Sequence, residues 1–471
     1  MLIIAPMNHR RSITKLSITA SPLQVAAGWP ADRPLCMLHS GRSHRRWARW
    51  SVLAEPVGFY RFDGRSRWTG RTGLMSEVDF SHDPLHDLDA ITAATATQAD
   101  STLPFVGGWI GYFSYDLGRW IEPAAAGRTG PTDDRSWPLI ELAYCPRALV
   151  FDNLTGQWHA VGDVALDALL RAQDQNDRVF TTGSICISVD PDEYLTMVSN
   201  TIDYIGAGDI FQANITQRLS APFNGSTRAL CQSAMTISKA WYGAYLELPD
   251  GRCILSLSPE LFLDVDFTSR SVITRPIKGT RPITVDARDL LESPKDAAEL
   301  HMIVDLMRND LGRVCEYGSV RVPQSRAIET HPTVHHGVAE ITGSLRADVG
   351  IGRLLGATFP GGSVTGAPKI RAMQIIDELE SIRRGPYCGA IGWISDHGLT
   401  RLNMAIRTIA LTGRRETGVW NTMVGTLDYG VGGGIVADSH PIAEYRESLD
   451  KAAVRRLVLA DQDAITPQRA T

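Results

Sequence analysis

The chain has 471 residues, of which 44% are hydrophobic and 21% are charged, and its formal net charge is −5. This composition is typical of a soluble globular protein that is long enough to bury a sizeable core. The slightly acidic balance argues against nucleic-acid binding, and the sequence lacks an apolar run of about 18 residues, so no membrane span is expected. The seven cysteines form no CxxC pair, which indicates reduced thiols in the cytoplasm and no zinc site.

The first part of the chain is expected to combine strands with short helices. Residues 1–20 are expected to form a loose N-terminal tail, and residues 21–170 to form the folded N-terminal region. Within it, the glycine- and aromatic-rich stretch GGWIGYFSYDL (107–117) predicts a turn at a sheet edge that leads into a strand. The polar stretch at 171–183 is the predicted linker to a second region at 186–460.

The second region opens with a predicted helix. Asp190 can cap this helix, Pro191 suits its first position, and apolar residues recur after it at helical spacing. The other elements predicted here are strands at 252–266 and 271–280, a long helix at 294–315 and a helix at 442–460. Because strands and helices are mixed without a regular βαβ alternation, the sequence predicts an α+β fold.

Two of these predicted helices carry carboxylates at a spacing of three residues. Asp296 and Glu299 share a face of the first helix, and Glu444 and Glu447 share a face of the second, with Lys451 one turn later. Two such helices could clamp one hard cation, and ligands that are all oxygen favour Mg²⁺. The alternative is that each pair lies on a solvated helix face.

Two glycine-rich stretches are candidates for binding a small anion. FPGGSVTGAPK (359–369) opens onto a helix, but Ala367 and Pro368 stand where a P-loop requires Lys and Ser or Thr, so nucleotide binding is disfavoured. The run 432–434 precedes a predicted strand and lacks the GxGxxG pattern of a dinucleotide-binding fold. Close backbone approach to an anion is the preferred interpretation of this run, and a bulge or tight turn is the alternative.

Long segments of the second region resemble the chorismate-utilising enzymes. The segments that occur in the order found in that family, over about residues 186–459, are SLSPELF, PIKGTRP, AAELHMIVDLMRNDLGRV, FPGGSVTGAPKIRAMQIIDELE, CGAIGW and GGGIVADSHPIAEYRESLDK. The resemblance implies two large antiparallel β-sheets packed as a sandwich with surrounding helices, and an active site in a cleft of the C-terminal region. The substrate that it implies, chorismate, is a small dicarboxylate, which fits anion-binding glycine loops.

The resemblance also implies roles for individual positions. The Mg²⁺ ligands that it implies are Glu299, Glu444 and Glu447, with Asp296 ligating through water or supporting the other three. The substrate-binding groups that it implies are Arg407 and Tyr387 at the enolpyruvyl carboxylate, the backbone of Gly432, Gly433 and Gly434, the hydroxyl of Ser363, and Lys451 near the ring carboxylate. Glu260 and His336 are placed to handle the C4 hydroxyl as it leaves and ammonia as it adds. Gln212 falls where the water-using members carry a lysine base, which argues against the isochorismate and salicylate reactions.

The position of Lys278 in PIKGT is occupied by different residues in different members of this family. From its neighbours alone it reads as an ordinary lysine in a tight surface turn. The pattern resembles the members that aminate chorismate at C4, the aminodeoxychorismate synthases, whereas anthranilate synthases carry a small residue there. In the former the lysine amine attacks C2 and expels the C4 hydroxyl, and ammonia then adds at C4 and expels the lysine. Such a nucleophile must be neutral and desolvated, and Arg275 and Arg281 are expected to disfavour its ammonium form.

The resemblance implies a partner and leaves alternatives open. Ammonia is expected from a separate glutamine amidotransferase subunit, because no glutaminase motif appears in the chain. MLHSG (37–41) resembles the segment that lines a tryptophan pocket in the ammonia-using members, with Ser40 as the contact. The main alternative is an anthranilate synthase component I, and a catalytically idle module that binds chorismate or tryptophan is the alternative of another class.

Overall fold

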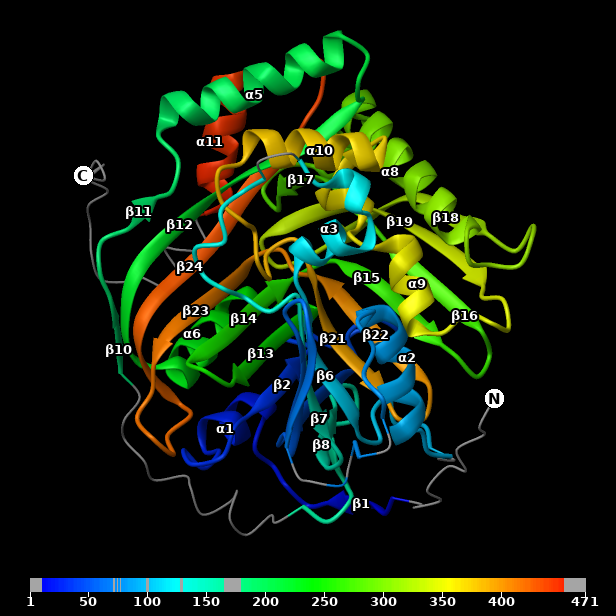
Figure 1. Cartoon of the computed structure of the whole chain (residues 1–471), viewed down its shortest axis with the longest axis vertical. Coiled ribbons are helices and arrows are strands. Elements are labelled where there is room, and N and C mark those ends of the chain that lie inside the picture. Colours follow the sequence, from blue (N-terminus) through cyan, green and yellow to red (C-terminus); the bar gives the residue numbers. More distant parts are fainter. Residues whose placement is uncertain are drawn as a thin grey trace.

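A computed structural model describes residues 11–70, 73, 75–76, 78–98, 101–127, 130–164 and 179–452. Its strands form two sheets, both built from antiparallel pairs (Figure 1). The larger sheet contains, in spatial order, β1 (Ile13–Leu16), β9 (Gln157–Val161), β8 (Ala148–Asp152), β3 (Trp50–Ala54), β2 (Cys36–His39), β13 (Tyr242–Leu248), β14 (Arg252–Ser258), β23 (Thr408–Arg414), β24 (Thr422–Ile435), β12 (Gln212–Ser226) and β10 (Phe180–Thr182), with β11 (Cys186–Ile187) and β20 (Gly366–Ala367) also paired to β12.

The strand that contains Lys278, β17, lies at one end of the strand order of the smaller sheet. Its strands, in spatial order, are β17 (Ile277–Pro282), β19 (Val334–Ser344), β16 (Ser271–Arg275), β15 (Leu261–Asp266), β22 (Leu399–Met404), β21 (Ala390–Ser395), β6 (Gly108–Phe113), β7 (Ile140–Cys145), β4 (Gly58–Phe62) and β5 (Ser66–Gly70), with β18 (Arg321–Thr330) paired to β19.

The two sheets pack face to face over a shared apolar layer. One buried cluster contains Val52 and Ile254 from the larger sheet together with Ile110 and Ile391 from the smaller one. Burial of this layer from both faces is the main favourable contribution to the sandwich. The predicted α+β fold, with two large antiparallel sheets packed as a sandwich, is confirmed.

Helices cover the outside of the sandwich. They are α1 (Pro22–Ala27), α2 (Pro84–Thr95), α3 (Gly118–Ile121), α5 (Pro191–Gly206), α6 (Thr227–Ser238), α7 (Ala287–Glu292), α8 (Pro294–Gly312), α9 (Ile351–Thr358), α10 (Lys369–Leu379) and α11 (Pro441–Lys451). Short 3-10 turns lie at Tyr115–Leu117, Pro123–Ala125 and Gly362–Val364. In Figure 1, α5, α8, α10 and α11 gather at one end of the molecule, over the ends of β12, β24 and β17. This end holds the predicted site residues.

Three helices of the second region follow the sequence prediction, whereas α6, α7 and α9 were not predicted. The Asp190 side chain caps α5 by accepting a hydrogen bond from Asp192, and Pro191 occupies the first turn. The long helix starts at Pro294 as expected and ends at Gly312, three residues before the predicted end. The last helix starts at Pro441, and its predicted end at 460 lies outside the described residues.

Three expectations about the first region need correction. The predicted loose tail at residues 1–20 contains a strand, β1 (Ile13–Leu16), whose backbone pairs with β9. The stretch at 107–117 does not lie at a sheet edge, because β6 is paired on one side with β21 and on the other with β7. The predicted linker ends in β10 (Phe180–Thr182), which pairs with β12. Both sheets contain strands from both predicted regions, so the two regions share one sandwich.

Candidate active site

Lys278 lies in a strand, and not in the tight turn that its neighbours suggested. β17 pairs with β19, and the register shifts between Ile277 and Thr280, which is a β-bulge. Gly279 has a φ of +81°, a conformation that favours glycine, and it forms the irregular part of the strand. Bulges interrupt the regular alternation of side chains along a strand, and Lys278 and Gly279 are the two residues inside this register shift.

The Lys278 amine lies against the backbone of β24 and the side chain of Gln212. A carbon atom placed one bond out from Gly434 Cα would lie 3.1 Å from Lys278 Nζ and 2.6 Å from Gln212 Nε2. Gln212 is fully buried, and its two side-chain polar atoms have no hydrogen-bond partner among the described residues. Unpartnered amide groups of this kind are costly without a ligand, and they mark this spot as a place for a polar molecule.

Burial lowers the pKa of Lys278, and nearby charges modify this effect. Glu299, Glu260 and Glu447 favour the ammonium form, whereas Lys451 opposes it. Arg275 and Arg281, which were expected to disfavour the ammonium form, are not among the charges that act most strongly on the pKa of Lys278.

The two arginines each bind a carboxylate. Arg275 donates to Glu329, and Arg281 Nη2 lies 2.6 Å from Asp296 Oδ2. The lowered pKa of Lys278 therefore comes from desolvation and from Lys451, and not from its neighbours in the sequence.

Glu260 is a buried carboxyl group with one hydrogen bond to Ser363. Ser363 Oγ, in the 3-10 turn Gly362–Val364, donates to Glu260 Oε1 over 2.7 Å. Burial raises the pKa of Glu260 to about 7, although the hydrogen bond from Ser363 and the positive charges of Lys278 and Arg407 act in the opposite direction. A carboxyl group with this pKa can both give and take a proton near neutral pH.

His336 lies on β19 and Arg407 lies in the loop between β22 and β23, and the two side chains are close to each other. His336 is buried on β19, and burial followed by the charge of Arg407 lowers its pKa well below the usual value, so the ring is neutral. Arg407 is half-buried and has a φ of 52°, which is unusual for a residue with a side chain. Backbone conformations of this kind are concentrated at functional sites, and the guanidinium of Arg407 lies near enough to Glu260 and His336 to lower the pKa of both.

The four predicted metal-binding carboxylates lie near each other, and two of them are paired with cations. The charges of Asp296 and Glu444 add to burial in raising the pKa of Glu299. Asp296 is bound by Arg281, and Glu447 by Lys451 over 2.8 Å. In the part of the chain that the structure describes, no group of three or more such side chains is already assembled around a point.

The chemistry of these four groups still fits Mg²⁺, because all four donors are carboxylate oxygens and half-buried Glu299 and buried Glu444 are not on a solvated face. Glu444 accepts a 2.7 Å hydrogen bond from Ser439 and lies beside Gly433. Arg281 contacts one oxygen of Asp296 and Lys451 contacts one oxygen of Glu447, so each of these carboxylates keeps a second oxygen that could bind the ion.

The predicted glycine run lies inside a strand and not before one. Gly432, Gly433 and Gly434 belong to β24 and pair with Thr216, Ile215 and Asn214 of β12. Lys451 Nζ donates to the carbonyl oxygen of Gly432 over 3.0 Å. The run thus places backbone, the Lys451 amine and the Lys278 amine next to each other, which agrees with close approach of a small ligand to the backbone.

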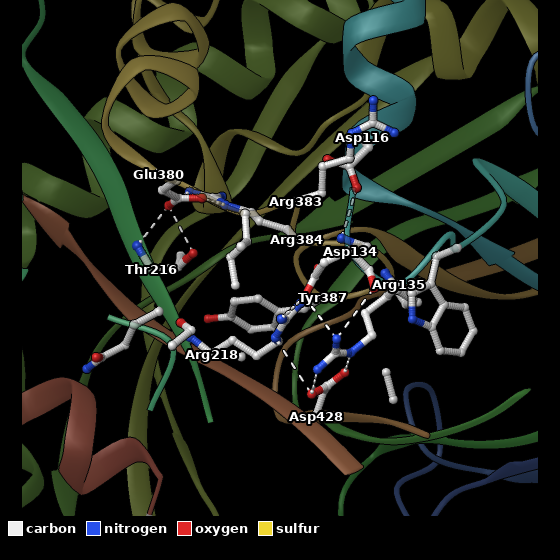
Figure 2. A pocket seen from close by; sticks show the side chains of 18 of the residues that line it. Asp116, Asp134, Arg135, Thr216, Arg218, Glu380, Arg383, Arg384, Tyr387 and Asp428 are labelled. Carbon is white, nitrogen blue, oxygen red and sulfur yellow. Dashed lines mark hydrogen bonds and ion pairs between the residues drawn. The ribbon is translucent and has the colours of Figure 1, made fainter. Parts of the chain in front are cut away.

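Tyr387 lies in the wall of a cavity of about 710 Å³ (Figure 2). Its ring packs against Gly430, and both Tyr387 and Arg407 lie close to Tyr429. Figure 2 shows ion pairs across this cavity, including Arg135 with Asp428 at 2.7 Å. Lys278, Glu260 and His336 do not line it. The sequence did not predict this cavity, because its walls come from segments that are far apart in the chain.

Ser40 lines a second cavity, of about 470 Å³, together with Trp47, Trp241 and Tyr242. The Ser40 hydroxyl donates to the carbonyl oxygens of Trp50 and Trp241 at 3.0 and 3.1 Å. The Tyr242 hydroxyl and the Trp241 Nε1 are buried without a partner within the described segments. The segment predicted to line a tryptophan pocket therefore does line a cavity, whose walls combine aromatic rings with polar side chains such as Arg401 and Asn403.

None of the helices in the described segments is long and apolar enough to cross a membrane.

Comparisons with known proteins agree with this arrangement. Residues 37–455 match the model of a family described as chorismate binding enzyme. The chain is 38% identical to aminodeoxychorismate synthase component 1 of Salmonella typhimurium, over 92% of this chain and 97% of that protein. It is 33% identical to anthranilate synthase component 1 of Pseudomonas aeruginosa, over 92% of each chain.

A solved structure shares the fold. The crystal structure of anthranilate synthase component I from Streptococcus pneumoniae matches with a TM-score of 0.72 and 30% identity, and the match covers 88% of this chain and 93% of that one. The two-sheet sandwich, the clustered carboxylates and glycines, and a match over most of the chain give one conclusion. The chain belongs to the chorismate-binding enzyme family.

Proposed function

We propose that this enzyme aminates chorismate at C4 and produces 4-amino-4-deoxychorismate, the precursor of 4-aminobenzoate for folate. The observation that carries this proposal is the half-buried amine of Lys278, whose pKa burial lowers and which lies against Gly434 and Gln212. An amine in this state is a nucleophile, whereas a surface lysine is not. The similarity to proteins named aminodeoxychorismate synthase component 1, at 37 to 40% identity, supports the proposal.

The first half of the proposed reaction forms a bond to Lys278. The neutral amine attacks C2, the ring double bond shifts, and the C4–O bond breaks with its electron pair going to oxygen. Glu260, with a pKa of about 7, gives its proton to that oxygen, so that water leaves. The products are a secondary ammonium at C2 and the Glu260 carboxylate.

The second half reverses the shift with ammonia. Ammonia attacks C4, the C2–N bond breaks, and its electron pair returns to Lys278, which leaves as a neutral amine. The new C4 ammonium loses one proton to a base of the site, for which Glu260 and His336 are the candidates. Gln212 is a neutral amide beside Lys278 and offers no base for water, which favours the ammonia reaction over a hydration.

The remaining site residues are proposed to hold the substrate. Arg407 would bind the enolpyruvyl carboxylate together with Tyr387, and Ser363 and the backbone of Gly432–Gly434 would contact the rest of chorismate. Glu299, Glu444 and Glu447, with Asp296, would hold Mg²⁺, and the ion would neutralise the carboxylates around the ring carboxylate of the substrate. Lys451, which already contacts Glu447 and the Gly432 carbonyl, would lie at the same carboxylate.

The proposed reaction consumes ammonia and therefore needs a source of it. Relatives carry the name component 1, and we infer a separate glutamine amidotransferase subunit as the source of ammonia. Tryptophan is the proposed ligand of the cavity at Ser40. The seven cysteines are all free thiols, which supports a cytoplasmic location.

The proposal is tested by product analysis. Purified protein is incubated with chorismate, Mg²⁺ and ammonium, and the products are separated by mass and fluorescence. The proposal predicts 4-amino-4-deoxychorismate and no anthranilate. Fluorescent anthranilate formed without an added lyase would instead identify an anthranilate synthase, the function named for relatives at 33% identity.

A further inference from the structure

The side chain of Thr280 contacts the buried ring of His336 across two strands. The two residues face each other in the pairing of β17 with β19, and Thr280 Oγ1 lies 2.9 Å from His336 Nδ1. His336 is 1% exposed, and its Nε2 has no hydrogen-bond partner among the residues that the structure describes. Because Thr280 occupies Nδ1, Nε2 is the nitrogen left for a ligand.

Aromatic packing holds the His336 ring on its other side. The ring of His331 lies 5.2 Å from that of His336 at an angle of 63°, and Trp241 lies 4.8 Å behind His331. These contacts restrain the ring of His336, and its Nδ1 can donate to the Thr280 hydroxyl or accept from it, according to which nitrogen carries the single hydrogen of the neutral imidazole.

The proposed reaction, on which this inference rests, leaves one proton to be placed. Glu260 supplies the proton for the departing hydroxyl, and a different proton must leave the nitrogen when ammonia adds at C4. We propose that Thr280 is a positioning residue that keeps the hydrogen of His336 on Nδ1, donated to Thr280 Oγ1. The lone pair of Nε2 then accepts a hydrogen bond from the ammonia that attacks C4, and the proton of the new C4 ammonium goes to the Glu260 carboxylate left by the first half as the C2–N bond to Lys278 breaks. The step ends with a neutral C4 amine, a neutral Lys278, a protonated Glu260 and a neutral imidazole whose Nδ1–H still donates to Thr280.

A neighbouring pair provides a matched control. Thr330 Oγ1 lies 3.0 Å from Nδ1 of His335, one position before His336 on β19 and on its opposite face. Thr330→Val removes the same kind of hydrogen bond without touching His336. Thr280→Ser keeps the hydroxyl that Thr280→Val removes.

Nitrogen NMR of the full-length protein labelled with ¹⁵N-histidine tests the contact without any turnover. The His336 signals are assigned by their loss in His336→Gln. The wild-type protein, Thr280→Ser and Thr330→Val are expected to carry the hydrogen on Nδ1 of His336, whereas Thr280→Val is expected to lose this preference. A wild-type ring protonated on Nε2, or an unchanged His336 ring in Thr280→Val, would overturn the inference.

Kinetics with chorismate, Mg²⁺ and ammonium test the step itself. Thr280→Val is expected to turn over about tenfold more slowly, the effect of one lost hydrogen bond, with little change in KM for chorismate and with more Lys278 adduct at steady state. Thr280→Ser is expected to restore turnover. Normal turnover in Thr280→Val, or less adduct than in the wild type, would contradict the role in the ammonia step. If the wild type forms no adduct, the proposed covalent route fails, while the NMR experiment still decides the contact between Thr280 and His336.

Discussion

The Ser363 hydroxyl donates its hydrogen bond to Glu260, the carboxyl group whose pKa burial raises to about 7. A bond from a hydroxyl to a carboxylate favours the charged form, so Ser363 holds the pKa of Glu260 below the value that burial alone would give. The contact thus keeps a buried acid within the pH range in which it can exchange a proton.

Glu260→Gln should make stability less dependent on pH. Because the folded-state pKa of about 7 lies above the ordinary value of 4.5 for a glutamate, the stability contributed by the proton of Glu260 is fully present below pH 4.5 and is lost as the pH rises through 7. The shift corresponds to on the order of 3 kcal/mol between those limits. Denaturant unfolding at pH 5 and pH 8 measures it, and the neutral variant should gain most relative to the wild type at pH 8. An equal difference at the two pH values would show that Glu260 is not buried as described.

Replacing Arg281 should strengthen Mg²⁺ binding. Arg281 binds Asp296 at 2.6 Å and competes with a cation for that carboxylate. Since surface ion pairs contribute up to about 1 kcal/mol, Arg281→Gln should lower the Kd for Mg²⁺ by up to about fivefold in calorimetric titrations.

The matched control for this titration is Arg308→Gln. Arg308 pairs with Asp305 at 2.8 Å on the exposed face of α8, the helix that also carries Asp296, and this pair lies away from the four carboxylates. That variant should bind Mg²⁺ as the wild type does. Unchanged Mg²⁺ binding in Arg281→Gln would mean that Asp296 takes no part in the metal site, and weaker binding would contradict competition between Arg281 and the ion.

Gln212→Leu should stabilise the free protein and weaken the substrate complex. The buried side chain of Gln212 has polar atoms without a partner in the described chain, and an apolar side chain of similar size removes that cost of about 1–3 kcal/mol. Thermal unfolding should show a higher Tm, and steady-state kinetics a higher KM for chorismate. A lower Tm with an unchanged KM would contradict a ligand-facing role for this amide.

Local features of the fold were predictable from the sequence, whereas features set by distant pairing were not. The α5 helix was predicted correctly because its cap at Asp190 and the proline at 191 act within one turn. The stretch at 107–117 was misplaced, because only β21, almost 300 residues later, makes β6 an interior strand. A glycine- and aromatic-rich strand can lie at the edge or in the interior of a sheet, so the sequence of β6 alone could not show which of the two it is.

The same distinction applies to the candidate site. The carboxylates of α8 and α11 could be predicted from their helical spacing, and the structure places them near each other. The environment of Lys278 could not, because its neighbours in the sequence, Arg275 and Arg281, are neutralised by carboxylates elsewhere. The bond between Ser363 and Glu260 joins residues about 100 positions apart and left no local signal.

The most direct test of the proposed function is a mass measurement on the intact protein. Chorismate and Mg²⁺ are added without ammonia, the protein is quenched and digested, and the peptide that contains Lys278 is examined. The proposed route predicts a mass increase equal to chorismate minus water on Lys278, which ammonium then removes as 4-amino-4-deoxychorismate appears. Formation of that product at the normal rate by Lys278→Ala, with no adduct on the wild-type peptide, would contradict the covalent role of Lys278.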